Sequence, residues 1–177
     1  MSAIGRPETN EYPTMYAAYI EQCTGADLLQ ALTMSHSRAS ELLMSLPRAM
    51  EDYRYAPNKW TIKDVVQHTI DTELVFAYRA LRFARMDATD LPGFEENDYA
   101  RAAETTRRTL EELMMEADIV RQSTLCLYRS LTPSMLLAKG TANGRTFSVR
   151  ALGWAIAVHE LHHLHILQER YLDHGNS

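Results

Sequence analysis

The chain has 177 residues, the length of one ordinary globular domain, and 46% of them are hydrophobic while 23% are charged. With only seven glycines and six prolines, it lacks the turn signals that a β-sandwich or barrel needs every ~8–12 residues, and its apolar content excludes a disordered chain. The net charge of −5 and the lack of a Lys/Arg-rich run argue against nucleic acid as a partner.

The N-terminal stretch MSAIGRPETNEYP contains no apolar signal core, and no stretch reaches ~18 uninterrupted apolar residues. We therefore expect no membrane span and a cytoplasmic protein. Cys23 and Cys126 cannot form a disulfide framework, which fits a reducing compartment. No internal repeat is present, so the sequence predicts one domain over 1–177, with 1–13 as an irregular arm.

The first two predicted helices each follow a capping pattern. A short extra helix is expected near 14–22. Thr24 and Asp27 then form the start signal of the first long helix, which Pro47 ends. Thr61 and Asp64 repeat the pattern at the start of the second, which should run to about Met86.

The third helix is predicted to begin near Asn97 or Asp98 and to continue to about Leu131. The fourth follows a turn at 140–144, with Ser148 as its N-cap, and its apolar residues continue to Leu172. Helices of roughly 22 to 33 residues, 33–50 Å long, pack side by side. The fold class is therefore all-α, a four-helix bundle, in which the connection 87–97 is long enough to lie over a site.

Histidines concentrate in the fourth predicted helix. The seven histidines are His36, His68, His159, His162, His163, His165 and His174. At about 100° per residue, His159 and His163 lie one turn apart in the middle of the apolar face. His162 lies on the shoulder of that face, whereas His165 should point away from the bundle.

A buried pair of imidazoles suggests a metal site. Burying two imidazoles without strong partners costs several kcal/mol, and a metal ion would satisfy both. His68 also points inward from the second helix and supplies a third ligand. Three neutral imidazoles with one open position are typical of a catalytic divalent metal. Imidazole suits Zn, Ni, Fe or Cu; Zn and Ni lead here.

The same segment also matches the H-E-x-x-H pattern of zinc peptidases: in the run HELHH, the pattern residues are His159, Glu160 and His163. The chain ends too soon after it for a further downstream ligand, and it offers no strand to border a peptidase cleft. Glu160 could still touch a metal-bound water as a base, or it could pair with a basic residue, which the pattern favours.

Four segments recur in the order found in one family: YRYAPNKWTIKDVVQHTIDTE, FAYRALRFAR, LPGFEENDY and ANGRTFSVRALGWAIAVHELHHLHILQERYL. Through them nearly the whole chain resembles the DinB/YfiT-like family of metal-dependent four-helix bundles. The resemblance implies that His68, His159 and His163 are the three metal ligands. It also implies chemistry such as thiol S-transfer or isomerisation with a low-molecular-weight thiol, and a homodimer.

A bound divalent metal would deprotonate such a thiol at neutral pH. Arg79, three turns beyond His68, could meet a carboxylate of the thiol; alternatively, its stem covers apolar surface. Asp71 and Glu73 could orient His68 through its second ring nitrogen, or could be solvated. Asp71 is also a candidate base.

The leading function is therefore a metalloenzyme that activates a thiol or water for group transfer on a small molecule. The alternatives are a metal-dependent hydrolase, with Glu160 or Asp71 as base, and a non-enzymatic metal- or ligand-binding bundle, such as a damage-response accessory. The wide apolar surface of the fourth helix is typical of a dimer interface, but a short covering helix would explain it equally well.

Overall fold

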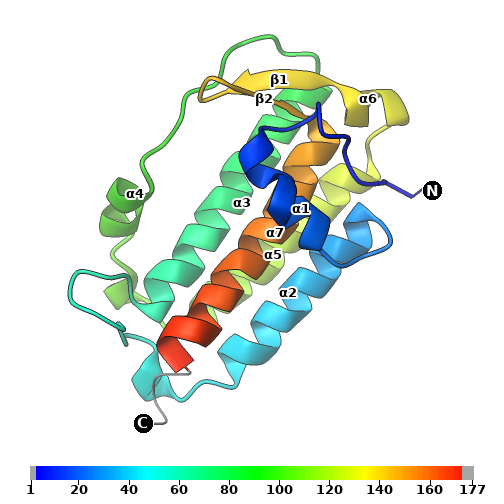
Figure 1. The fold of residues 1–177 in the computed structure, drawn as a ribbon. Coiled ribbons are helices and arrows are strands. Elements are labelled where there is room, and N and C mark those ends of the chain that lie inside the picture. Colours follow the sequence, from blue (N-terminus) through cyan, green and yellow to red (C-terminus); the bar gives the residue numbers. More distant parts are fainter. Residues whose placement is uncertain (1–2, 173–177) are drawn as a thin grey trace.

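The computed structural model describes residues 3–172 and is mostly helical (Figure 1). The four long helices are α2 (Leu28–Met44), α3 (Ile62–Ala84), α5 (Leu110–Arg129) and α7 (Val149–Ile166). They contain 17, 23, 20 and 18 residues, so most are shorter than expected. The predicted four-helix bundle is confirmed. Residues 1–2 and 173–177, which include His174 and both ends of the predicted domain, lie outside the described residues.

The order of the helices around the bundle is α2, α7, α3, α5, which differs from their order in the chain. Both α2 and α3 pack against α5 and α7. The connection from α3 to α5 runs back along the bundle: Leu91 pairs with Ala142 beside the end of α3, whereas Thr105 donates a hydrogen bond to Asp64 at its start. Consequently α3 and α5 run in the same direction, and α7 lies beside α3 in the opposite one (Figure 1).

Side-chain caps set the start of three of these helices, and the caps at Thr61 and Ser148 are the ones that the sequence predicts. At α3 the Thr61 hydroxyl accepts from the Asp64 N–H, and the Asp64 carboxylate accepts from the Thr61 N–H. Thr109 and Glu112 form the same reciprocal box at α5. The Ser148 hydroxyl caps α7. Each cap satisfies backbone N–H groups that the first helical turn leaves without a partner.

The predicted Thr24 cap is wrong. The side chain of Asp27 caps α2 instead, by accepting from the Gln30 N–H, and the helix begins at Leu28. Gly25 has φ of +139°, a conformation that a helix cannot contain, so no helix can run through this position.

The single third helix predicted from Asn97 or Asp98 to Leu131 is also wrong. The chain forms α4 (Glu96–Ala102), a 3-10 turn η3 (Thr105–Arg107) and then α5. Glu104 has φ of 47° in the left-handed region, which interrupts the right-handed helix, and the Thr109 box starts a new one.

A short hairpin precedes α7, where the sequence predicts only a turn. Strands β1 (Lys139–Ala142) and β2 (Arg145–Ser148) pair antiparallel, after the small helix α6 (Pro133–Leu137). Asn143 and Gly144 both have positive φ, as a two-residue hairpin turn requires. A Cβ at Gly140 would lie 2.1 Å from the Phe83 ring, so this glycine lets the hairpin rest on the end of α3.

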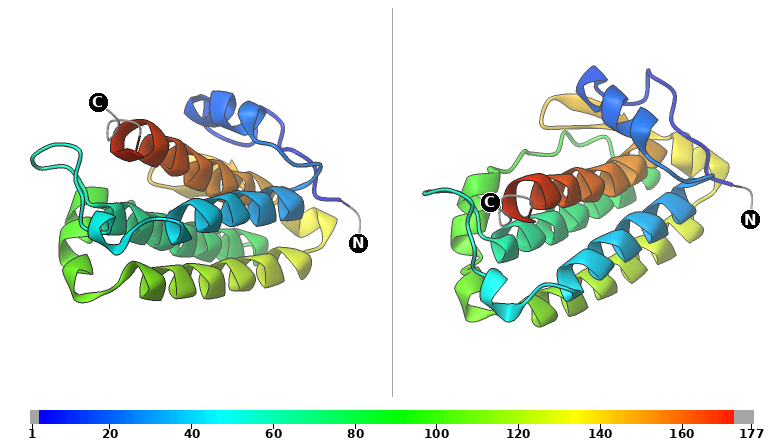
Figure 2. Two further views of the ribbon diagram at one scale, coloured as in Figure 1. Left: turned by 90° about the horizontal axis from the view of Figure 1, so that it is seen from below. Right: turned by 60° about the horizontal axis from the view of Figure 1, so that its bottom comes forward.

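The N-terminal segment covers the outer face of α7 (Figure 2). It contains a 3-10 turn η1 (Thr14–Tyr16) and the predicted short helix, α1 (Ala17–Gln22). A second 3-10 turn, η2 (Arg48–Met50), lies elsewhere, after α2. The Trp154 ring N–H donates to the Gly5 carbonyl, and Glu11 accepts from Ser148 and Arg150. The broad apolar surface of α7 is thus covered within the chain, and the homodimer stays a prediction.

The core lies in two clusters along α7. One surrounds the buried run Val149–Val158, and the other surrounds Leu164 and Leu167 near the start of the π-helical turn η4 (Leu167–Leu172). The histidine-rich stretch lies between these clusters, which flank it with apolar packing. Within residues 3–172, no helix is both long and apolar enough to cross a membrane.

Candidate metal centre

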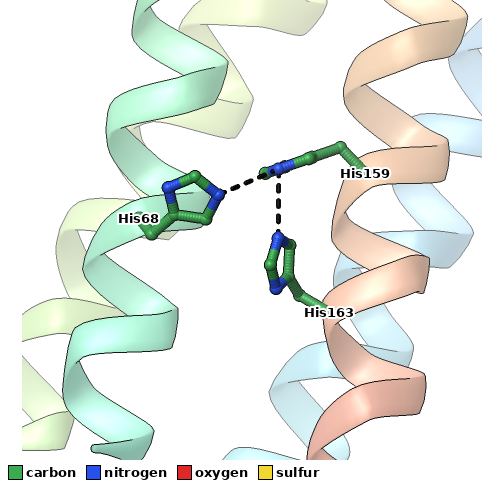
Figure 3. A group of neighbouring side chains, drawn as sticks. All are labelled: His68, His159 and His163. Atoms are coloured by element: carbon green, nitrogen blue, oxygen red, sulfur yellow. Dashed lines mark hydrogen bonds between the residues drawn. The ribbon is translucent and has the colours of Figure 1, made fainter. Parts of the chain in front are cut away.

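Three imidazoles from two helices meet in the bundle (Figure 3). His68 extends from α3, and His159 and His163 extend from successive turns of α7. The Nε2 atom of His159 lies 3.1 Å from Nε2 of His68 and 3.2 Å from Nε2 of His163. The structure therefore brings together the three histidines that the sequence selects, because α7 lies beside α3.

The spacing of these nitrogens suits a metal ion. Two nitrogens bound to tetrahedral zinc, each ~2.05 Å from the ion, lie roughly 3.3 Å apart. Hydrogen bonding alone fits less well, since a neutral ring nitrogen is either a donor or an acceptor and His159 Nε2 faces two neighbours. One ion between the rings would satisfy all three nitrogens.

The surroundings keep the three rings neutral, which is the form that binds metals. Burial lowers the pKa of His68 to about 4 and that of His163, next to other imidazoles, to about 3. Burial and the neighbouring imidazoles hold the pKa of His159 well below its usual range. The Trp60 ring packs 4.8 Å from His68 between centroids, which adds to the apolar surroundings. At neutral pH a metal would not have to displace protons from these rings.

Neither carboxylate predicted to orient His68 does so. The Asp71 carboxylate accepts a hydrogen bond from Gln67, and burial raises its pKa. Glu73 accepts two hydrogen bonds from Arg121, at 2.9 and 2.8 Å. Among residues 3–172, no carboxylate contacts the second ring nitrogen of His68. Asp71, the candidate base, is thus directed elsewhere.

Glu160 belongs to a buried ion-pair network, as its structural interpretation predicts. Its carboxylate accepts hydrogen bonds from Arg121 at 2.9 Å and from Ser35 at 2.6 Å, and it lies 3.2 Å from His36. Burial alone would raise the pKa of Glu160, but the Arg121 charge and these hydrogen bonds lower it. The arrangement holds the carboxylate in its charged form and engages both oxygens, so Glu160 is not placed as a peptidase base.

This Arg121 network, which comprises Arg121, Glu73, Glu160, Ser35 and His36, joins all four long helices. Sequence reasoning did not single out Arg121. The sequence does contain a hint of its burial, because Arg121 lies beside Val120, Thr124 and Leu125 on the apolar side of α5. Such a position indicates a buried cation that needs acidic partners.

The other histidines of α7 lie outside the cluster. The His165 side chain is 65% exposed and pairs with Glu169, as its predicted outward direction requires. His162 is half-buried and packs edge-on against Tyr19 of α1.

A cavity of about 240 Å³ opens onto His68 and His159. Phe94 and Glu96 line it, so the connection predicted over a site does border one. Arg79 lies in the same wall; its side chain is buried and donates to the Pro92 carbonyl at 2.8 Å. Larger hollows of about 630 and 620 Å³ lie elsewhere on the described surface and do not reach the cluster.

Comparison with known proteins gives the family of the chain. The model of the DinB superfamily matches residues 31–167, which include all three clustered histidines. The chain belongs to the DinB superfamily. No curated protein matches it significantly.

Two solved structures share the fold of this DinB protein. YfiT from Bacillus subtilis, described as a probable metal-dependent hydrolase with an unusual four-helix bundle topology, is 13% identical with a TM-score of 0.72, over 98% of this chain and 95% of its own. A mycothiol-dependent maleylpyruvate isomerase is 14% identical with a TM-score of 0.64, and the match spans 77% of this chain and 58% of the isomerase. At such identities the likeness shows the fold alone.

Proposed function

We propose that this DinB protein is a metal-dependent enzyme in which His68, His159 and His163 hold a divalent ion, with Zn or Ni as the leading metals. The observation that carries the proposal is the cavity that opens onto His68 and His159. Three protein ligands beside an open cavity leave a coordination position for a small molecule, as catalytic sites do.

The residues of the chain would divide the work in a simple way. A divalent ion, when bound, lowers the pKa of a coordinated thiol or water and so supplies a nucleophile at neutral pH. The three neutral imidazoles hold that ion, and the two core clusters fix the helices that carry them. The cavity aligns the small molecule with the cluster and limits access of bulk water.

A thiol-dependent transferase or isomerase is the favoured reaction class. A thiol needs no further base once its proton has left, and the two candidate bases are engaged elsewhere: Glu160 with Arg121, and Asp71 with Gln67. The mycothiol dependence of the similar isomerase supports this choice. The similarity to YfiT, a probable metal-dependent hydrolase, supports the second candidate, a hydrolase that activates water at the same cluster.

A non-enzymatic binding bundle would use the same three histidines differently. It would close the coordination sphere with a fourth protein ligand, as structural zinc sites do. Within residues 3–172, the only group of three or more potential ligands within reach of one another is His68, His159 and His163. A set of three ligands beside a cavity favours the enzyme.

Cobalt substitution tests these alternatives together. Protein purified without chelator should carry about one divalent ion per chain, and the cobalt form should change its visible spectrum when a small thiol is added. A spectrum that responds to thiols, with turnover of electrophiles only when thiol is present, supports the transferase. Turnover without thiol would favour the hydrolase, and a spectrum indifferent to every added ligand would overturn both.

A further inference from the structure

Arg79 is a buried cation without an acidic partner. The residue is 6% exposed, its guanidinium donates one hydrogen bond to the Pro92 carbonyl, and its Cζ atom lies 5.6 Å from the Phe76 ring centroid. No Asp or Glu oxygen among residues 3–172 lies within ion-pair distance of it. A guanidinium has five N–H donors, so most of the donors of Arg79 are available to a ligand.

Other buried cations of the chain are paired. Arg121 contacts Glu73 and Glu160, and Lys63 contacts Asp52. Because a buried charge is costly unless it is paired, the exception at Arg79 calls for a counter-ion that is not part of the described chain.

Several further polar residues line the same cavity. Arg145 of β2 lines it and, within residues 3–172, likewise has no acidic partner; its guanidinium contacts the Met15 sulfur. Thr72, one turn beyond His68 on α3, is 3% exposed, and its hydroxyl has no hydrogen-bond partner in the described chain. Glu96 is the acidic residue of the lining, and it is exposed at the rim.

The cavity also has aromatic side chains in its walls. His68 and Arg79 are eleven residues apart on α3, a rise of roughly 16 Å along the helix, and an arginine side chain leans back toward the N-terminal end. Three aromatic side chains also line the cavity: Phe76 of α3, Phe94 of the long connection and Phe147 of β2. A volume of about 240 Å³ suits a small molecule and lies below the ~300–1,000 Å³ of drug-sized sites.

We propose that the cavity selects a small molecule with a carboxylate or similar anionic head, which Arg79 binds and Arg145 supports, and with an apolar body that lies along the aromatic walls. The opposite end of this molecule reaches the histidine cluster. This last part rests on the metal-dependent function proposed above; the recognition of the anion does not.

The anionic head could belong to the thiol itself or to the electrophile that it attacks. The chemistry is the same in both cases, and two sets of probes distinguish them. Mercaptoalkanoic acids of increasing chain length and their methyl esters test the thiol. Sulfur-free phenylalkanoic acids and their primary amides test the other source.

The affinity for the sulfur-free set is measured by calorimetric titration of the metal-free protein. The affinity for the thiols is measured by spectroscopic titration of the cobalt form. In each set, at least one acid should bind about ten times more tightly, or better, than the neutral analogue of the same chain length. This difference corresponds to one charge-assisted hydrogen bond. Arg79→Met should remove this preference while leaving the affinity of the neutral analogue unchanged. Arg79→Lys should retain part of it, and Arg145→Met should reduce it less.

Glu96→Gln is the matched control, since it removes a charge from the same rim and should preserve or increase the preference for acids. Equal affinity of acids and neutral analogues in both sets, or an acid preference that survives Arg79→Met, would overturn the inference. Cobalt protein that ignores every thiol, while the metal-free protein still prefers acids, would instead refute the metal-thiol function and leave the anion site standing.

Discussion

Two polar clusters lie inside the same bundle, and they differ in how completely the chain satisfies them. In the Arg121 network, charged and hydroxyl groups from four helices are matched by hydrogen bonds. In the histidine cluster three neutral rings face one another, and a cavity opens beside them. A buried polar group that the chain satisfies by itself contributes to the structure, whereas one left for an outside partner indicates a binding site.

Neighbouring residues of one helix separate the two clusters. His159 faces His68 on α3, while Glu160, rotated by about 100°, binds Arg121 on α5 and Ser35 on α2. The H-E-x-x-H pattern therefore joins two residues that serve different clusters. A peptidase would need both to act on one water.

Removing a ring of the histidine cluster should have the largest effect and should leave the Arg121 network intact. His159→Ala should reduce the bound metal from about one ion per chain to almost none, because two imidazoles bind far less tightly than three. Metal analysis by mass spectrometry, with circular dichroism as a check on folding, measures the loss.

The matched control for that loss is His165→Ala, because the His165 side chain is exposed on the same helix and should keep its full metal content. Equal losses in the two variants would contradict the division of α7 into inward and outward histidines.

Breaking the Arg121 network should do the opposite. Arg121→Met leaves Glu73 and Glu160 as buried charges without their cation, so we expect a loss of ~3–5 kcal/mol in the free energy of unfolding. Urea denaturation measures it, and metal content per folded chain should not change. Arg101→Met removes an exposed ion pair and should leave stability unaltered. Metal loss in Arg121→Met would show that the two clusters are coupled.

Acidification should affect the stability of the two clusters with opposite signs. In the metal-free protein the pKa of His68 is about 4 and that of His163 about 3, against ~6.5 when unfolded. Between pH 6.5 and 4 the unfolded state binds more protons, so these rings lower stability as the pH falls, by up to ~1.4 kcal/mol per pH unit for each. His68→Gln should flatten this slope.

His36 acts in the other direction. Burial alone would lower its pKa, but the hydrogen bonds to Glu160 and Asp118 raise it. Its contribution is therefore fully present below the unfolded pKa of ~6.5 and is lost as the pH rises through the folded value. His36→Gln should remove a gain in stability on acidification toward pH ~6.5 and leave the slope between pH 6.5 and 4 unchanged. Parallel pH profiles of denaturation for wild type and both variants measure the two slopes; a steeper loss in His68→Gln than in wild type would refute the assignment.

The smallest effects are expected at the helix caps. Thr61→Ala, at the start of α3, and Thr109→Ala, at the start of α5, should each cost ~1 kcal/mol and leave the metal content unchanged. Thr61→Ser retains the hydroxyl and should keep most of the stability. Thermal unfolding compares the three variants, and a change in metal content in either alanine variant would indicate that the cap also positions a cluster.

Local patterns predict much of this molecule. The caps at Thr61 and Ser148, the bundle and the inward direction of His68, His159 and His163 all follow from spacing and periodicity, because each depends on residues within one or two turns. The sequence does not predict the break at Glu104, where a residue of ordinary helix propensity adopts a left-handed conformation.

What the sequence could not supply is the set of partners across the bundle. Asp71 and Glu73 both follow His68 closely on α3, yet Gln67 and Arg121 bind them. Which acid meets which base depends on the order of helices around the bundle, and no local pattern determines that order. The same is true of Arg145, which reaches the cavity only because the hairpin rests on the end of α3.

The N-terminal segment has a consequence for how such proteins diverge. The part that defines the family, residues 31–167, holds the three histidines, Arg79 and Arg145, whereas Tyr16, which also lines the cavity, precedes it. Glu11, Gly5 and Tyr19 connect this segment to α7 or its N-cap, away from the three clustered rings. Mutations before residue 31 can therefore reshape this side of the cavity while the three histidines keep their positions.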